Sequence, residues 1–436
     1  MKKLISILCA GAMLLSLAAC GSTSGGASAA DTNITADSVV SSDKAGSTNT
    51  GSTVTDADIA AQLAGAVTLT FSDSGITADG SGGFETDGTA LTITDAGAYV
   101  LTGSCADGSV KVKKGVTGVT LVLSGLELTS TDTAPITCAK SSQVVLYAAA
   151  GTENRLADTA QNNDETYSEN ADAENAVIKC KDGSQVTLCG SGSLVIEANG
   201  KNGIKSGATT AEEGEASLTI RDITLTIAAP VNDAINAEQL LVIESGTLTI
   251  AAGDDAIHCD LLLNIGAEGT DGPAITITDC YEAFEAATLN ILSGDIDITS
   301  SDDCLNAANS DLSGYAFSMN ISGGTITAFS SGGDGFDSNG SLTISGGTVV
   351  VWTANAADNQ PLDADGTITI SGGTVLAAGG SSTLTADAQT GSISSGMGGM
   401  GSPGGQMPDG QFPGGNGQRP SMPGNEQSPA APGSGS

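Results

Sequence analysis

Apolar and polar residues alternate around a glycine in a short unit that recurs along residues 178–376. Its approximate form is L-x-I-x-G-x-x-I-x-I, and copies begin at Leu240, Leu289, Met319, Leu342 and Ile368. Each copy is typical of two strands with a period of two residues, joined at the glycine. Between copies lies a shorter piece, such as Asp-Asp-Ala-Ile-His, with one apolar anchor. The anchors are Ile204, Ile235, Ile257, Phe284, Leu305, Phe336 and Leu362.

The spacing of the anchors indicates the fold. Successive anchors are 31, 22, 27, 21, 31 and 26 residues apart. A minimum of 21 or 22 residues with insertions elsewhere is typical of a parallel β-helix, because one coil needs three short strands and their turns. Helical repeats are longer and lack the alternation, and a β-sandwich would not repeat one motif at corresponding corners. We predict an all-β solenoid over residues 66–380, with a β-rich cap at its N-terminal end.

The first residues have the pattern of an export signal. Two lysines precede an apolar run that ends in Leu17-Ala18-Ala19-Cys20. This pattern predicts a signal peptide at residues 1–19, cleavage before Cys20 and a lipid on its sulfur. The alternative is an ordinary signal peptide followed by an incidental cysteine. The prediction places the protein on the extracellular face of the membrane, which it contacts only through the lipid anchor.

The segments on either side of the predicted solenoid have compositions that do not support a core. Residues 20–65 are mostly Ser, Thr, Gly, Ala and Asp, which predicts a flexible, lipidated tether. Residues 381–436 are rich in Gly, Pro and Met, which predicts a disordered tail.

Charge narrows the possible partners. The chain has 14 basic and 50 acidic residues, and residues 222–391 contain acidic residues but no lysine or arginine. Nucleic acid and anionic membrane surfaces are therefore excluded as general partners. The balance favours cations, or anionic polymers that cations bridge. We expect a monomer.

The cysteines fit the repeat better than they fit a disulfide framework. Seven remain beyond Cys9 and Cys20, and none forms a C-x-x-C pair. Several occupy a position two residues after an anchor, where other repeats have Ala or Ser. We predict buried thiols at these positions. Cys138 and Cys180 are the pair that stacking brings close enough for a disulfide.

The same alignment stacks acidic side chains on both sides of the anchors. Adjacent coils are about 4.8 Å apart, so repulsion within such a column costs several kcal/mol unless cations neutralise it. Calcium suits carboxylate oxygens from neighbouring coils, whereas zinc or copper prefer nitrogen or sulfur and His258 is the sole histidine. The alternative is a solvated acidic face. The predicted calcium ligands are Asp233, Asp254, Asp255, Glu282, Glu285, Asp302, Asp303, Asp334, Asp337 and Asp363.

A set of motifs carries a family resemblance over about residues 66–380. They include Ala96-Gly-Ala-Tyr-Val-Leu-Thr-Gly-Ser, Gly151-Thr-Glu-Asn-Arg-Leu-Ala-Asp and the repeated Ile-Ser-Gly-Gly-Thr. The chain resembles the carbohydrate-binding-domain lipoproteins of clostridial and related Gram-positive bacteria. This resemblance implies a right-handed parallel β-helix similar to pectate lyases, with calcium bound at its surface. It also implies binding of plant-wall polysaccharide, including acidic polymers such as polygalacturonate.

Three functions remain open from the sequence. The first is non-catalytic, calcium-dependent binding of acidic plant polysaccharide, with Tyr281, Lys201 and Lys205 as further ligand contacts. The second is a polysaccharide lyase, which needs a basic side chain beside the calcium. Candidate bases lie only on coils before the acidic half. The third is a surface adhesin or structural spacer that recognises protein.

Overall fold

The computed structural model describes residues 56–354, 359–379, 382–387 and 392–395. The predicted signal peptide, the lipid site at Cys20 and most of the predicted tether and tail lie outside these residues. Strands dominate, and α1 (Asp56–Leu63) is the one α-helix in the part that the structure describes. No helix among the described residues is long and apolar enough to cross a membrane.

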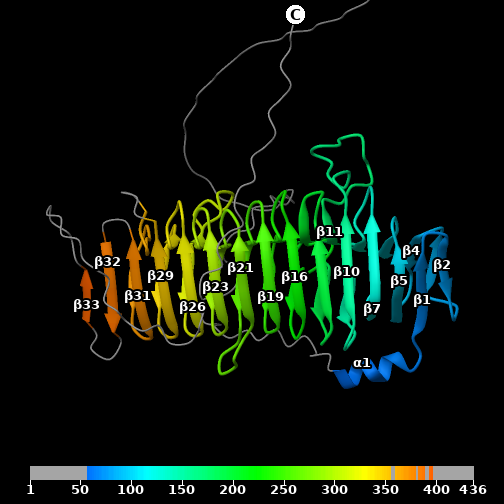
Figure 1. Ribbon diagram of the computed structural model, residues 1–436, viewed down its shortest axis with the longest axis horizontal. Coiled ribbons are helices and arrows are strands. Elements are labelled where there is room, and N and C mark those ends of the chain that lie inside the picture. The colour runs from blue at the N-terminus through cyan, green and yellow to red at the C-terminus, as the bar shows by residue number, and fades with distance from the viewer. Residues whose placement is uncertain (1–55, 355–358, 380–381, 388–391, 396–436) are drawn as a thin grey trace, which may run out of the picture.

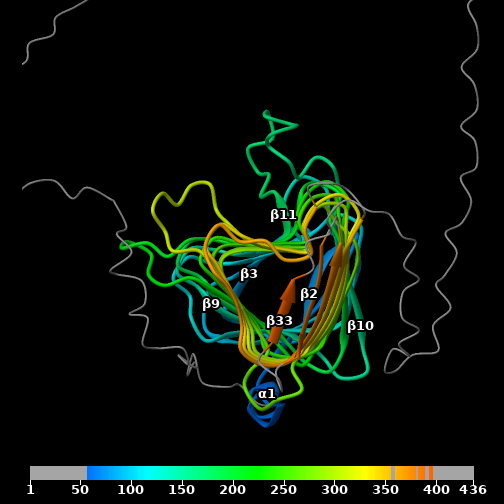
Figure 2. The same cartoon turned by 90° about the vertical axis from the view of Figure 1, so that its left-hand side faces the viewer.

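The strands stack into one large, mostly parallel sheet that winds around a central core (Figures 1 and 2). Three parallel ladders form its walls, and each strand pairs with the equivalent strand of the next turn, which we call a rung. The first ladder faces the viewer in Figure 1. It consists of β1 (Val67–Ser72), β5 (Gly97–Cys105), β7 (Val119–Ser130), β10 (Glu153–Asp158), β13 (Ser193–Glu197), β16 (Thr224–Ala229), β19 (Thr247–Ala252), β21 (Ala274–Asp279), β23 (Asp295–Ser300), β26 (Thr325–Ser330), β29 (Thr348–Thr353) and β31 (Thr374–Gly379).

The second ladder carries the anchors, and the third closes each turn. The second consists of β4 (Ala90–Ile93), β6 (Ser109–Val112), β8 (Ile136–Cys138), β11 (Ala176–Cys180), β14 (Asn202–Ser206), β17 (Ile235–Ala237), β20 (Ile257–Ile265), β22 (Phe284–Ile291), β24 (Leu305–Ala307) and β27 (Phe336–Ser338). The third consists of β9 (Gln143–Ala148), β12 (Gln185–Cys189), β15 (Ser217–Ile220), β18 (Leu240–Ile243), the second halves of β20 and β22, β25 (Ser318–Ile321), β28 (Ser341–Ile344) and β30 (Ile368–Ile370).

The remaining strands are antiparallel and lie at the two ends. At the N-terminal end, β2 (Gly75–Ala78) pairs with β1, and β3 (Phe84–Asp87) pairs with β4. At the other end, β32 (Ser382–Asp387) pairs with β31, and β33 (Ser392–Ser395) pairs with β32. These two strands fall within the segment predicted to be a disordered tail. Such pairing covers an otherwise open sheet edge.

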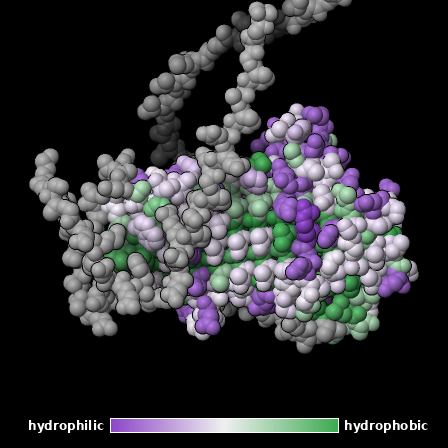
Figure 3. All heavy atoms as spheres, in the orientation of Figure 1, coloured by the Kyte–Doolittle hydropathy of each residue, from purple (hydrophilic) through white to green (hydrophobic). Residues whose placement is uncertain are grey.

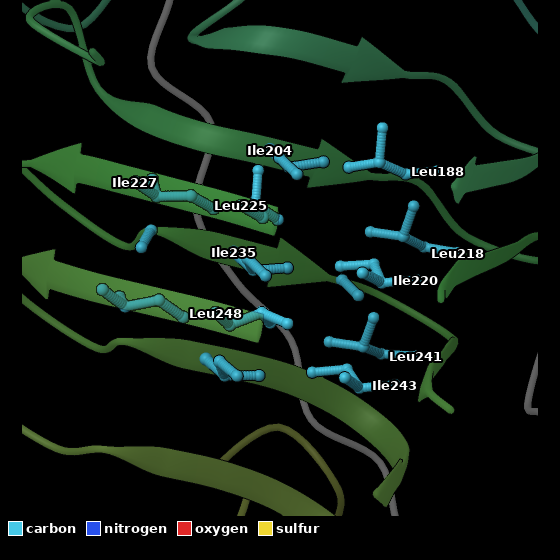
Figure 4. Packing of buried hydrophobic residues seen from close by; sticks show 14 of the residues in the cluster. Leu188, Ile204, Leu218, Ile220, Leu225, Ile227, Ile235, Leu241, Ile243 and Leu248 are labelled. Carbon is cyan, nitrogen blue, oxygen red and sulfur yellow. The ribbon is translucent and has the colours of Figure 1, made fainter. Parts of the chain in front are cut away.

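Columns of equivalent apolar side chains fill the interior. Ile204, Ile235, Ile257, Phe284, Leu305 and Phe336 occupy equivalent ladder positions, and Leu362 extends the column through an isolated bridge. Figure 4 shows part of this core, where leucine and isoleucine side chains from the three walls meet. The stacking of anchors predicted from the sequence is confirmed. The structure supports a solenoid-like all-β fold, while the handedness of the winding stays a prediction.

The recurring Ile-Ser-Gly-Gly-Thr sequence has a backbone cause. Its second glycine has a φ of 79° at position 347 and 75° at position 373, in the region that side chains disfavour. A Cβ on Gly347 would lie 2.7 Å from the carbonyl oxygen of Gly324 on the preceding rung. Glycine is therefore required at this corner by both conformation and stacking.

Two further predictions have definite outcomes. All seven cysteines in the described part of the chain are buried thiols, and this confirms the prediction for the positions in the small-residue column, Cys138, Cys180 and Cys259. Cys138 and Cys180 lie directly opposite one another as thiols.

The predicted tether extends too far, because residues 56–63 form α1 and Ile59 packs against Val122 on the outside of the sheet.

The anchor column sets the stability of the stack. Phe284 is fully buried, and we expect Phe284→Ala to lower the free energy of unfolding by about 3–5 kcal/mol, because it leaves a cavity between rungs. Thr249→Ala, an exposed position on β19, should change it by no more than about 0.5 kcal/mol. Urea unfolding followed by circular dichroism measures both. Equal effects of the two substitutions would contradict a stacked anchor core.

Candidate functional site

One column of outward side chains on the second ladder changes charge along the axis. The residue after each anchor is in register from rung to rung. Three of the four early rungs carry lysine, the middle rungs carry an amide and an imidazole, and the later rungs carry two carboxylates with an amide between them. The column reads Lys111, Thr137, Lys179, Lys205, Asn236, His258, Glu285, Asn306 and Asp337.

A pocket of about 310 Å³ opens at the middle of this column. Carboxylates from successive rungs converge on it because equivalent corners stack. Five of the ten predicted calcium ligands line it, together with Tyr281, whose side chain is 48% exposed. The full lining is Asp233, Asn236, Asp254, Asp255, His258, Tyr281, Glu282 and Glu285.

His258 lies among three carboxylates. Its Nδ1 is 2.7 Å from a Glu285 oxygen and 3.1 Å from an Asp255 oxygen, and its Nε2 is 2.9 Å from Asp260. Burial alone would lower the pKa of His258, but the hydrogen bonds to these carboxylates raise it far above its ordinary value. The three carboxylates therefore favour the protonated imidazole, whose positive charge offsets part of the negative charge of the pocket. Asp260 was not among the predicted site residues, although a period of two places positions 258 and 260 on one face.

Burial shifts the acids of the pocket toward the neutral form. It raises the pKa of Asp255 from 3.8 to about 7 and that of Glu282 from 4.5 to about 8. Repulsion contributes in the same direction, from Asp233 and Glu285 on Asp255 and from Asp255 and Glu285 on Glu282. One rung further, burial raises the pKa of Asp303 to about 7. Each of these groups ionises more easily when a cation is near.

A second acidic cluster lies toward the C-terminal end. One carboxylate oxygen from each of Asp334, Asp337 and Asp363 lies within 4.8 Å of the others. Burial raises the pKa of Asp334 and of Asp337. Between the pocket and this cluster, Asn306 donates to Glu282 over 3.0 Å, while its Oδ1 is buried without a partner. The predicted ligands thus form two groups, with Asp302 and Asp303 on the rung between them.

The predicted ligand contacts outside the acidic column have different surroundings. The hydrogen bond of Tyr281 to Asp302, together with the negative charge of that carboxylate, raises the pKa of the phenol to about 12. Lys201 forms an ion pair with Glu165, and Lys205 lies 3.7 Å from Glu238. Neither lysine lines the pocket.

Lys179 is a further feature of the basic end. Its pKa is lowered by burial and by the adjacent Lys205. The lyase alternative needs a lysine or arginine as its base, but Lys179 lies on β11, three rungs before His258 on β20. The lysine pair and the acidic pocket therefore occupy different parts of the column.

The geometry can be compared with known proteins. A family model described as "carbohydrate-binding domain-containing protein" matches residues 87–388, which is well over half of the chain. The chain belongs to this family. A protein of the same description from Acetivibrio thermocellus is 31% identical over 137 residues, which cover 31% of this chain and 46% of that relative. The chain thus aligns with less than half of the relative's length.

One solved structure is also similar to this carbohydrate-binding domain. It is described as the polysaccharide lyase-like protein from C. thermocellum, in a gadolinium derivative. The match has 21% sequence identity and a TM-score of 0.38, and it covers 70% of this chain and 98% of the other.

The raised acid pKa values predict how stability depends on pH. Between pH 4 and the folded-state pKa values of about 7 for Asp255 and about 8 for Glu282, these two groups bind more protons in the folded carbohydrate-binding domain than in the unfolded chain. Its stability should therefore fall as pH rises through this range. Scanning calorimetry in EDTA should show a falling melting temperature, and calcium should reduce the decline. Glu282→Gln should flatten the slope. A melting temperature that rises across this range in EDTA would contradict the assignment.

Proposed function

We propose that this protein is a non-catalytic, calcium-dependent binder of acidic plant polysaccharide, such as polygalacturonate, on the bacterial surface. The observation that carries the proposal is the convergence of carboxylates from successive rungs on one pocket. Membership of a carbohydrate-binding family supports a polysaccharide as the ligand. The export pattern ending at Cys20 supports a lipid-anchored protein on the outer face of the membrane. We also propose a right-handed winding for the parallel solenoid.

The donor set suits calcium. Calcium takes six to eight oxygen ligands in flexible geometry, and the pocket supplies carboxylate oxygens from Asp233, Asp255 and Glu282 on three successive rungs. The cluster of Asp334, Asp337 and Asp363 offers a second set made of oxygen alone. The unpartnered Oδ1 of Asn306 lies between the two sets. A cation would offset the burial and the mutual repulsion that raise the pKa values of Asp255 and Glu282.

Calcium also accounts for how an acidic protein would hold an acidic polymer. Uronate carboxylates and the protein's own carboxylates repel one another, and a divalent cation between them reverses the sign of the interaction. Lys205, one rung before Asn236 of the pocket, offers a direct positive contact at the basic end of the column. The polymer would therefore be held by bridged and direct charges along one face.

The two alternatives have weaker support. A lyase needs a proton acceptor beside the metal, yet the described pocket is lined by neither lysine nor arginine. The carboxylates around His258 raise its pKa, which makes it a poor proton acceptor. A spacer or adhesin needs only the exposed solenoid surface. It becomes the preferred function if a glycan array gives no binding.

Calcium binding is the first test. We expect calorimetric titration to give a dissociation constant on the order of 0.1–1 mM, typical of extracellular calcium modules. The double variant Glu282→Gln and Glu285→Gln should weaken the pocket site at least about tenfold, because it removes two charged oxygens. Asp311→Asn, at an exposed loop position, is the matched control and should bind as the wild type does. If the titration shows no heat of binding at millimolar calcium, the proposed cation site is refuted.

Polysaccharide binding is the second test. Insoluble polygalacturonate should deplete the protein from solution in calcium, release it in EDTA and recover it when calcium is added back. The double variant should remain in solution under all three conditions. Equal depletion in calcium and EDTA would overturn the bridging model. Release of unsaturated sugars that absorb ultraviolet light would instead indicate a lyase.

A further inference from the structure

The outward face of the first ladder changes character on its last rungs. On β16 and β19 the outward residues are threonine and alanine, and on β23 they are Asp295, Asp297 and Thr299. On the three rungs that follow, large apolar side chains face outward. We call these residues the C-terminal apolar patch: Phe329 on β26, Val350 and Trp352 on β29, and Leu376 on β31.

Two aromatic rings form the centre of this patch. Phe329 and Trp352 are direct partners in the parallel ladder, with ring centroids 5.7 Å apart and planes inclined by 33°. The side chains of Trp352 and Leu376 are 38% and 39% exposed. On the next rung, Ala378 lies opposite Trp352, so only a methyl group flanks the indole there. Figure 3 shows green surface at this left-hand end of the sheet.

The patch is not needed to fill the core. The inward residues of the same strands, Val349, Val351 and Val375, are already buried and continue the interior columns. Leaving an indole and a phenyl ring exposed gives no packing benefit to the fold, and contiguous exposed apolar surface usually marks a binding site. Aromatic rings with flat, accessible faces are favoured where a ligand has both apolar and polar edges.

The residues around the C-terminal apolar patch favour an uncharged ligand. Thr299 lies opposite Phe329, and Thr327 lies two residues before Phe329 on the same outward face of β26. Asp295 and Asp297 face outward on the preceding rung, and the whole segment from residue 222 to 391 has no lysine or arginine. An anionic sugar is repelled here. A neutral pyranose offers an apolar face of C–H groups for the rings and hydroxyl groups at its edge for the threonines and aspartates.

We propose that Phe329 and Trp352, with Leu376, form a second polysaccharide contact that binds the apolar face of a neutral pyranose without a metal ion. Family membership as a carbohydrate-binding domain agrees with a sugar as the occupant. The patch lies on the first ladder, whereas the acidic cluster at Asp334 and Asp337 lies past the corner formed by residues 331–335. The two contacts therefore have different chemistry and separate tests.

Trp352 is the sole tryptophan of the chain, so intrinsic fluorescence reports directly on the patch. We titrate the full-length protein in EDTA with neutral β-1,4-linked hexasaccharides of glucose, mannose and xylose, and with hexagalacturonate. At least one neutral sugar should shift the emission to shorter wavelength and protect Trp352 from acrylamide quenching. Hexagalacturonate should do neither. The measurement needs no variant and no calcium, so failure of the calcium site leaves it unaffected.

Variants then identify the residues by binding calorimetry with the sugar that gave the shift. Phe329→Ala and Trp352→Ala should each weaken binding about tenfold or more, because each removes one stacking ring. Trp352→Phe should restore much of the affinity. Thr249→Ala, four rungs before Trp352 on the same face, is the matched control. Unchanged melting temperatures confirm that the variants fold.

Several results would overturn the proposal. One is no emission change with any neutral sugar. A second is equal affinity of wild type and Trp352→Ala. A third is an emission change that occurs only with hexagalacturonate in calcium, which assigns the response to the acidic column. If acrylamide fails to quench Trp352 in sugar-free protein, another part of the chain already covers the patch, and the proposal is wrong.

Discussion

The parallel register between successive rungs is the constraint on which the rest of this structure depends. Each backbone position is held opposite its equivalent about 4.8 Å away, so a side chain chosen for one rung meets the same kind of side chain on the next. Inside the stack this repetition is favourable, because Ile235, Ile257 and Phe284 bury one another in a continuous column. Outside, the same repetition forces like charges together.

The acidic corner shows the cost of that repetition. Asp233, Asp255 and Glu282 cannot separate without breaking the ladder, so burial and mutual repulsion raise the pKa values of Asp255 and Glu282. Two features of the protein reduce the repulsion between these carboxylates. Protonation neutralises some carboxylates, and His258 supplies a positive charge between Asp255 and Glu285. Both responses make this corner sensitive to the concentration of protons and cations.

The ladders also divide the surface chemically. The second ladder carries a row that passes from lysines at β11 and β14 to carboxylates at β27, whereas the first ladder presents threonine and then the apolar patch around Trp352. Each ladder is a flat, repetitive face that extends along the axis. A long polymer can contact such a face over several rungs, and this suits a carbohydrate-binding family better than a single deep cleft does.

Much of the fold and of the candidate site could be predicted from the sequence, because in a repeat each residue lies beside the equivalent residue of the next unit. The anchors, the buried cysteine column and the in-register acids, including Glu285 beside His258, depend only on aligning one unit with the next. The pairing of Phe329 with Trp352 is predictable in the same way, since each lies four residues after the threonine of an Ile-Ser-Gly-Gly-Thr copy.

Only the tertiary structure decided the contacts made by the parts that break the repeat. The ion pair of Lys201 with Glu165 depends on the insertion between β10 and β11, and the salt bridge of Lys205 depends on Glu238 beyond the end of β17. The packing of α1 beneath Val122 and the pairing of β32 with β31 likewise join segments outside the periodic unit. Periodicity fixes neighbours within a ladder, but the paths of insertions and ends depend on packing across the whole molecule, which no local pattern encodes.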